Sequence, residues 1–365
     1  SSDLLITILQ RETEPSPDHE TQEVLVKVQG GPNGNELGEI LSGKFEGAVY
    51  SSVKAKDLFD GEKAYIRFPD TSSSIEQILS GIQKKSTTLD QVCSVNQGVV
   101  PGALTVTSSH LNKYPNLNAK KGDPIFIFPA GDLEKMSGNK QAEYIVPYFK
   151  NSDIYRYVTE AESDKELLYS DGNINIDDSI IQYLKNFKEI LISRREFKDG
   201  KRPWYNLHWP RSPKIFNGEK IVVPYRSHGN TFAYNNFPFY GSTDMYFINN
   251  KDGGNIDLLA LVGILNSKLM FVWLYLRGKR KGEVLELFTT PLKELPIVVP
   301  DQAISSTISG IVSKIISAKS NHHDADISLL ENQIDSIVFN LYGLEENEAK
   351  VILDFFESHH GNRSF

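Results

Sequence analysis

The feature that most constrains this chain is a stretch in which basic and aromatic side chains alternate, residues 188–226. It holds ten Lys and Arg against four Asp and Glu, a balance of +6, whereas the whole chain has a formal net charge of −8. Trp204, Tyr205, His208 and Trp209 lie between the cations. Cations bind phosphates and flat rings stack on bases, so the pattern is typical of a nucleic-acid-binding surface. It also fits an irregular loop that covers a core and turns its cations to solvent.

Composition limits the class of protein. A chain of 365 residues is long enough for two or three folding units. The single cysteine, Cys93, excludes an internal disulfide and cysteine-rich zinc patterns, which suits a reducing cytoplasm. No secretory signal is expected, because residues 1–20 show no basic stretch followed by an apolar run and small residues. The apolar run 258–276 contains Gly263, Asn266 and Lys268, so it is expected to be a buried helix and not a membrane span.

Hydrophobic periodicity predicts a mixture of strands and helices. Strands are expected at residues 4–9 and 23–29, which would form a hairpin, and then at 88–97, 124–129, 167–169, 220–224 and 244–248. Helices are expected from residue 73 and at 177–195, 256–276, 304–315 and 330–341, with a short acidic helix up to residue 356. Gly98 and Gly102 are expected where the backbone turns tightly or approaches another backbone.

Several short motifs occur in a fixed order along the second half of the chain. They are Trp-Tyr-Asn-Leu-His-Trp-Pro-Arg at 204–211, Lys-Ile-Val-Val-Pro at 220–224, Tyr-Phe-Ile at 246–248, the run 258–269, and Pro-Leu-Lys-Glu-Leu-Pro-Ile at 291–297. Together they resemble the TaqI-type C-terminal specificity domain. That domain is the DNA target-recognition part of adenine-N6 methyltransferases and of type IIG restriction-modification enzymes. The resemblance covers about residues 73–344.

The resemblance implies an α+β fold, a mixed α/β target-recognition domain with a small β-rich N-terminal extension and a C-terminal helical hairpin. The expected boundaries are 1–72 for the N-terminal segment, read as the end of a methyltransferase domain, 73–300 for the recognition domain and 301–365 for the helical segment. The implied partners are double-stranded DNA and a methyltransferase domain of the same polypeptide, in the cytoplasm and away from membranes. S-adenosylmethionine would bind that other domain, whose adenine target is flipped. A homodimer through the C-terminal helices is left open.

The same reading assigns roles to individual side chains. Phosphate contacts are expected from two basic loops, which contribute Lys198, Lys201, Arg202, Arg211, Lys214 and then Arg277, Lys279, Arg280, Lys281. Base contacts in the major groove are expected from Gln97, Arg226, His228 and Asn230. Trp204, Tyr205 and Trp209 form the aromatic loop. For the basic loop at 277–281 the alternative is a solvated turn, and for Gln97 a plain β-turn. Lys150, Asp153 and Arg156 are expected to form a local ion network in preference to a phosphate clamp.

Catalytic motifs are missing from the chain. No Pro-Pro dipeptide occurs, so the Asn/Asp/Ser-Pro-Pro-aromatic motif of adenine-N6 methyltransferases is absent, as is a glycine-rich cofactor turn. Glu196 and Lys198 have the spacing of an endonuclease pair, but no strand surrounds them and no partner Asp is clearly placed. Adjacent His322 and His323 do not share a helix face. We therefore expect recognition without catalytic residues, metal or cofactor in this chain, and leave open whether the parent enzyme also cuts DNA.

A second class of function fits the same sequence. The aromatic loop and the helical hairpin could belong to a protein-interaction or assembly module of a defence complex. Binding that weakens steeply with salt favours DNA, whereas salt-insensitive self-association favours assembly.

Overall fold

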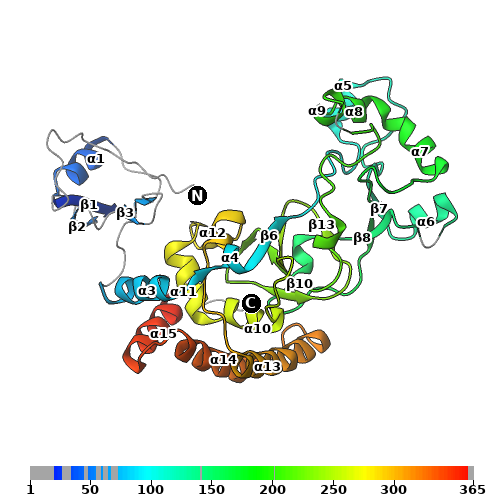
Figure 1. Ribbon diagram of the computed structural model, residues 1–365. Helices are drawn as coiled ribbons and strands as arrows, with labels where there is room; N and C mark the ends of the chain where they lie inside the picture. Colours follow the sequence, from blue (N-terminus) through cyan, green and yellow to red (C-terminus); the bar gives the residue numbers. More distant parts are fainter. Residues whose placement is uncertain are drawn as a thin grey trace. The chain divides into compact units, whose positions relative to one another are not determined.

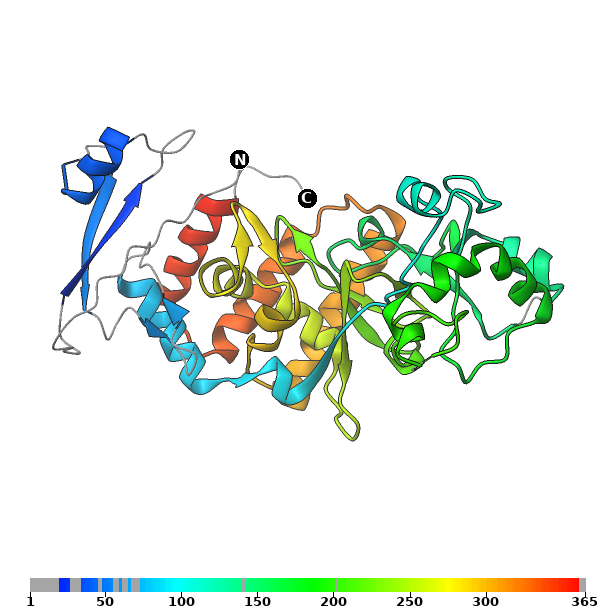
Figure 2. The same ribbon diagram turned by 90° about the horizontal axis from the view of Figure 1, so that it is seen from above.

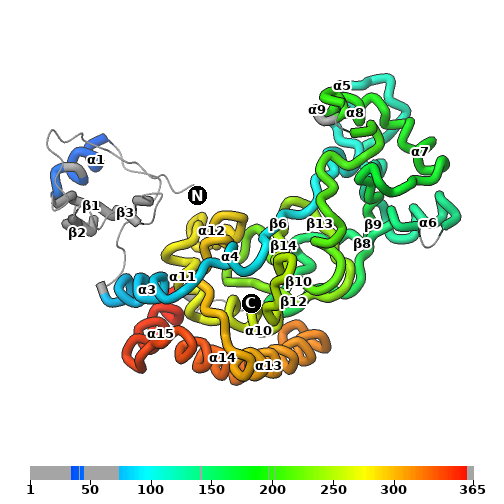
Figure 3. The backbone as a smooth tube through the Cα atoms, viewed as in Figure 1, coloured from blue at the N-terminus to red at the C-terminus, as the bar shows by residue number. Residues whose placement is uncertain are grey.

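The computed structural model describes residues 20–26, 34–44, 48–54, 59–60, 65–66, 73–139, 142–200 and 202–360 (Figures 1 and 3). The chain divides into two compact units, Ser1–Gln77 and Ile78–Phe365. The second unit contains most of the predicted recognition segment and the whole described part of the C-terminal segment. The boundaries after residues 72 and 300 stay predictions.

The first unit is built on an antiparallel pair of strands. β1 (Glu20–Val26) pairs with β2 (Ala48–Lys54), and α1 (Gly34–Leu41) lies between them in the sequence. β3 (Phe59–Asp60) and β4 (Tyr65–Ile66) form a second, shorter pair. The strand expected at 23–29 overlaps β1. Its expected partner at 4–9 lies outside the described residues.

The second unit contains two four-stranded sheets and smaller pairings. The central sheet has the order β12-β10-β14-β6 and is antiparallel throughout; its strands are β6 (Cys93–Gln97), β10 (Lys220–Pro224), β12 (Ala233–Asn235) and β14 (Met245–Asn250). The second sheet has the order β13-β8-β9-β7, with strands β7 (Ile127–Pro129), β8 (Ile145–Phe149), β9 (Lys165–Leu168) and β13 (Tyr240–Gly241). The strands predicted at 220–224 and 244–248 are thus confirmed, and β10 is buried at every residue.

Three short strands form a further sheet, and one pair joins distant parts of the chain. β11 (Arg226–Ser227) and β15 (Arg280–Lys281) both pair with β16 (Val284–Glu286), in the order β11-β16-β15. β5 (Thr87–Thr88) pairs with β17 (Pro296–Ile297). The basic segment that follows the long apolar run is therefore a β-hairpin, not a free turn.

Helices gather at the two ends of this unit. Figures 1 and 2 show one group with the second sheet at one end, where the helices are α5 (Ser108–Lys113), α6 (Asp132–Ser137), α7 (Asp178–Leu184), α8 (Lys188–Ile192) and α9 (Arg195–Lys198). The remaining helices are α3 (Ser73–Lys85), α4 (Leu89–Val92), α10 (Leu258–Leu265), α11 (Lys268–Arg277), α12 (Thr289–Lys293), α13 (Gln302–Asn321), α14 (Ser328–Leu341) and α15 (Glu346–His360). The three C-terminal helices confirm the predicted pattern. Three single turns of 3₁₀ helix are η1 (Asn151–Asp153), η2 (Lys185–Phe187) and η3 (Pro213–Ile215).

The single helix expected at 256–276 is wrong in one respect, because α10 and α11 meet at a bend of 62°. At the break the Asn266 amide donates to the Phe232 carbonyl at 2.8 Å and accepts from the Phe232 N–H at 3.1 Å, while the Ser267 hydroxyl caps α11. Both helices are buried, as expected. Among the described residues no single helix is long and apolar enough to cross a membrane, and only this bent pair passes that test together.

Gly98 lies where two backbones meet. Its N–H donates to the Met245 carbonyl at 3.1 Å, and a Cβ at this position would overlap the carbonyl oxygens of Gly241 and Ser242. The close approach expected for this glycine is therefore observed. It fixes the end of β6 against the turn that precedes β14.

Replacing Gly98 with Ala should lower the free energy of unfolding by roughly 1–3 kcal/mol, because backbone atoms cannot move aside as a flexible side chain can. Gly310→Ala is the matched control: this exposed glycine of α13 has nothing within 4 Å of the added Cβ. There the change should raise stability by about 0.5–1 kcal/mol. Urea unfolding of both variants measures the two effects. Equal effects at the two positions would contradict the close packing at Gly98.

Candidate nucleic-acid interface

A carboxylate stands between two cations on the small sheet. Arg226 in β11 lies directly across from Glu286 in β16. Its Nη2 and Nε donate to Glu286 Oε1 at 2.8 and 3.2 Å. On the other side, Lys279 Nζ lies 3.9 Å from Glu286 Oε2. The Glu286 side chain is only 9% exposed, against 50% for Arg226 and 64% for Lys279. The hydrogen bond to Glu286 raises the pKa of Arg226.

Aromatic rings surround these charges. The Arg226 guanidinium lies 4.8 Å from the Tyr225 ring centre, and Lys279 Nζ lies 5.1 Å from that of Phe288. Tyr225 and Phe288 are themselves 6.2 Å apart, edge to face. Cations held over ring faces in this way are attracted by the ring quadrupole. We call Tyr225, Arg226, Lys279, Glu286 and Phe288 the hairpin cluster.

The predicted aromatic loop forms a second surface. Trp209 is 38% exposed, and the Arg202 guanidinium lies 5.9 Å from its ring centre. Lys188 Nζ lies 5.7 Å from the ring centre of Trp204, whose ring meets that of Tyr205 at 87°. The backbone of this loop is fixed from behind. Trp209 exchanges two hydrogen bonds of 2.9 Å with Val100, and Arg194 donates to the Trp204 carbonyl at 2.6 Å.

The segment after β6 borders both surfaces. Gln97 Nε2 donates to the Tyr246 hydroxyl at 3.3 Å, and the Tyr246 ring is 6.5 Å from that of Tyr225 in the hairpin cluster. Three residues later, Val100 pairs with Trp209. Three residues of extended chain span at most about 11 Å. Gln97 therefore connects the hairpin cluster with the aromatic loop. Its amide also donates to the Thr243 carbonyl at 2.9 Å, which fixes its orientation.

The structure places the other predicted contacts in different environments. Those that are exposed are Lys198, Arg211, Lys214, His228, Lys279, Arg280 and Lys281. Arg202 is half-buried and donates to the Asp171 carbonyl at 3.3 Å. Lys201 lies outside the described residues. The exposed side chains, together with Gln97, Arg226 and the aromatic loop, stay the predicted DNA contacts.

Asn230 is a structural residue, which corrects the expectation that it reads a base. Its side chain is buried, and Nδ2 donates to the carbonyls of Leu265 and Ser267 at 2.9 Å each. Its Oδ1 accepts from Arg156 Nη1 at 3.0 Å. Both amide hydrogens are therefore used, and none remains for the bidentate contact that Asn makes with adenine.

Arg277 and Lys220 are also internal, although both were counted as cations of basic segments. Arg277 is 8% exposed; it donates to Ser80 and Gln83 of α3 and lies 5.0 Å from the Trp273 ring centre. A phosphate contact from Arg277 is therefore a wrong expectation. Lys220 Nζ is buried and donates to three oxygens, those of the Gly218 carbonyl, the Asn235 amide and the Phe237 carbonyl, at 2.6–2.8 Å. Burial lowers the pKa of Lys220 to about 7. Because the side chain lies in the interior, it is not part of the surface that could contact phosphates.

The predicted local network of Lys150, Asp153 and Arg156 is wrong as well. Arg156 Nε donates at 2.8 Å to Glu331 of α14, and its other nitrogens donate to Asn230 and to the Asn266 carbonyl. Lys150 instead lies 3.6 Å from Asp164. Burial raises the pKa of Glu331, but the charge and hydrogen bond of Arg156 outweigh it and hold that pKa below its usual value. Residues 175 positions apart form this pair, so local spacing could not reveal it.

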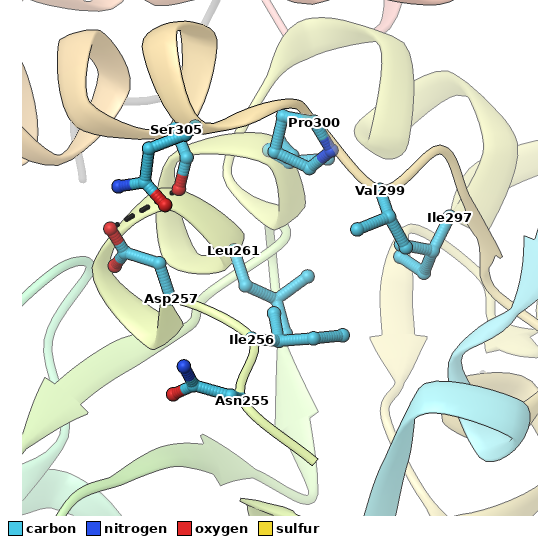
Figure 4. A pocket seen from close by; sticks show the side chains of 10 residues that line it. Asn255, Ile256, Asp257, Leu261, Ile297, Val299, Pro300 and Ser305 are labelled. Carbon is cyan, nitrogen blue, oxygen red and sulfur yellow. Dashed lines mark hydrogen bonds between the residues drawn. The ribbon is translucent and has the colours of Figure 1, made fainter.

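One small cavity lies where α10 and α13 begin (Figure 4). Its volume is about 90 Å³, below the roughly 300–1,000 Å³ of typical ligand sites. Asp257 caps α10 there and accepts hydrogen bonds from Ser305 at 3.2 Å and Ser309 at 2.6 Å. The carboxylate therefore ties α10 to α13. Within the described part of the chain, no group of three or more His, Cys, Asp and Glu is arranged to hold a metal ion.

Glu286 is the site residue that sequence reasoning missed. It stands in the otherwise apolar run Val-Leu-Glu-Leu at 284–287, in which an acid at a strand position is unusual. This acid in an apolar run was the sequence feature that could have indicated a buried partner for a cation. Its two partners precede it by 60 and 7 positions, and only the pairing of β11 and β15 with β16 brings all three together.

Part of this chain is similar to known proteins. Residues 146–297 match the model of the TaqI-like C-terminal specificity domain. The chain is 23% identical over 222 residues to the Type II methyltransferase M.BstVI of Geobacillus stearothermophilus, covering 60% of this chain and 37% of that protein. It is 26% identical over 188 residues to the Type II methyltransferase M.HincII of Haemophilus influenzae, covering 45% and 36%. The chain thus spans about a third of the length of these curated relatives.

The fold is also similar to a solved structure. The type IIL restriction-modification enzyme MmeI, solved in complex with DNA, superposes with a TM-score of 0.50 at 15% identity, over 75% of this chain and 36% of that one. At this identity the similarity concerns the fold alone. The comparisons confirm the resemblance drawn from the motifs and the mixed α+β class.

Replacing Arg156 with Met tests whether it is a structural residue. The change should lower the free energy of unfolding by roughly 3 kcal/mol, because it leaves the Glu331 carboxylate and the Asn230 amide oxygen without their donor. Lys150→Met removes a partly exposed cation from the same motif and should cost less than about 1 kcal/mol. Denaturant unfolding at neutral pH compares them. A larger loss for Lys150→Met would contradict the buried network.

Proposed function

We propose, from the premise that residues 146–297 form a TaqI-like C-terminal specificity domain, that this chain recognises the DNA target of a restriction-modification or methylation enzyme. The match to that domain is the observation that carries the proposal. Its relatives are named Type II methyltransferases. The exposed cations of the hairpin cluster and the aromatic loop suit the role together with the exposed Trp209 and the partly buried rings beside them, because they combine phosphate contacts with flat surfaces for bases.

We assign phosphate contacts and base contacts to different residues. Lys198, Arg211, Lys214 and the exposed hairpin cations at 279–281 neutralise phosphates, which fixes the protein on the duplex without reading it. Gln97, Arg226 and His228 contact base edges. Trp204, Tyr205 and Trp209 provide the aromatic surface beside them. Gln97 and Trp209 support the assignment through their connection by the segment after β6.

The rest of the enzyme follows from the relatives and stays a proposal. We infer that adenine-N6 methylation, with S-adenosylmethionine as the methyl donor, is performed by a methyltransferase domain of the same polypeptide and not by the residues of this chain. Nuclease activity of the whole enzyme is a separate question, which measurement of DNA cleavage would answer. Because the proposed target is the DNA inside the cell, we propose that the protein acts in the cytoplasm.

Salt dependence tests this function. Duplex binding by the full chain should weaken steeply between 50 and 200 mM salt, as expected when several phosphates are neutralised. Lys214→Ala should weaken binding to all sequences about equally and reduce the salt slope by about 1. Lys314→Ala removes an exposed lysine of α13, outside the proposed surface, and should change neither. Fluorescence anisotropy at four salt concentrations measures both quantities.

Two results would overturn the proposal. One is duplex binding that lacks sequence preference and is equally affected by Lys214→Ala and Lys314→Ala. The other is salt-insensitive self-association without DNA binding, seen by sedimentation, which is the behaviour of an assembly module using the aromatic loop or the C-terminal helices.

A further inference from the structure

The hairpin cluster contains an acid where a DNA-binding surface should disfavour one. A carboxylate repels phosphates, yet Glu286 lies between Arg226 and Lys279 and is nearly buried. We propose that Glu286 is a positioning residue that aims Arg226 at a guanine, so that the pair determines one base of the target. This inference rests on the proposed function. It adds Glu286 to the residues that determine specificity and guanine as the base that Arg226 contacts.

The geometry of the guanidinium supports this assignment. Glu286 Oε1 accepts from both Nε and Nη2, so it occupies the side edge of the Arg226 group. The side chain is half exposed, and its other close partner is Tyr225, whose ring lies against the guanidinium. Glu286 therefore does not occupy the edge formed by Nη1 and the second hydrogen of Nη2. Guanine offers O6 and N7 in the major groove, two acceptors that match such a pair of donors.

The neighbours of Arg226 restrict its movement. The guanidinium lies 4.8 Å from the Tyr225 ring centre, which limits tilting, while Glu286 limits rotation within its plane. An arginine on an open surface would lose much more side-chain freedom when it bound a base. A preoriented arginine loses less, so more of the contact energy separates guanine from other bases.

Glu286 is itself held on both sides. Its N–H donates to the Lys279 carbonyl at 2.7 Å, and β16 pairs with β11 and with β15. Lys279 lies 3.9 Å from the second carboxylate oxygen and partly neutralises it. The backbone of the acid is thus fixed, which limits how far its carboxylate can follow Arg226 toward solvent. This arrangement distinguishes it from a pair of flexible surface side chains.

The test compares four versions of the full chain: wild type, Arg226→Gln, Glu286→Gln and the double variant. Each is incubated with a duplex library randomised over eight base pairs, and the bound fraction is sequenced. Glu286→Gln keeps the size of the side chain but removes its charge. Glu283→Gln removes the same charge from the turn of the same hairpin and is the matched control. Thermal unfolding of each variant shows whether the fold is kept.

Wild type should select guanine at one position by roughly tenfold or more, the range of one bidentate contact. Arg226→Gln should remove this preference, and Glu286→Gln should reduce it severalfold at the same position only. The double variant should match Arg226→Gln, because two residues that act as one unit do not have additive effects. Glu283→Gln should alter total binding and leave the preference unchanged.

Different results identify different errors. Should wild type bind without sequence preference, the proposed function itself fails. Should wild type select a sequence but Arg226→Gln retain every preference, or Glu286→Gln change the guanine preference no more than Glu283→Gln does, the positioning role fails and the proposed function stands. If Glu286→Gln unfolds, Glu286→Asp supplies the comparison: it keeps the charge, shortens the reach, and should reduce the same guanine preference.

Discussion

The buried hydrogen bonds of Arg156 are the interaction on which the second unit most depends. This side chain joins the loop after β8 to Asn230, to the break between α10 and α11, and to Glu331 of α14. A charged group removed from water is tolerated only when its donors are satisfied. Because Arg156 needs partners from three separate segments, those segments have one favourable arrangement. The C-terminal helices are therefore part of the scaffold of this unit.

The network also explains the position of the hairpin cluster. Asn230 follows β11 by three residues and is fixed by Arg156, Leu265 and Ser267. β11 itself has only two residues and could not hold a direction alone. Its position comes from β16 on one side and from the buried Asn230 after it. The buried Asn230 amide thus helps to fix the position of the exposed Arg226, four residues before it.

Sequence patterns predicted the elements whose cause is local. The apolar spacing of α13, α14 and α15 and the apolar run 221–224 of β10 are such cases, since a few neighbouring residues define each buried face. The break at Asn266 was missed because its cause is the Phe232 backbone, 34 positions away. Likewise, nothing near Asn230, Arg277 or Lys220 indicates that each is buried. A polar residue can lie on the surface, or it can lie in the interior when its polar atoms are hydrogen-bonded. Only its tertiary partners decide between the two.

The net charge of a segment overestimates the charge on its surface, because some of its cations are buried. The stretch 188–226 has a balance of +6, but it includes Lys220, which lies in the core, and Arg194, which braces the aromatic loop from behind. Cations used internally cannot neutralise phosphates. The exposed cations that remain are fewer, and one of them, Arg226, is partly neutralised by Glu286. Such a surface attracts any duplex less strongly than its composition suggests. Because non-specific affinity comes from the phosphates, lowering it leaves base contacts a larger share of the binding energy, which favours discrimination over tight binding.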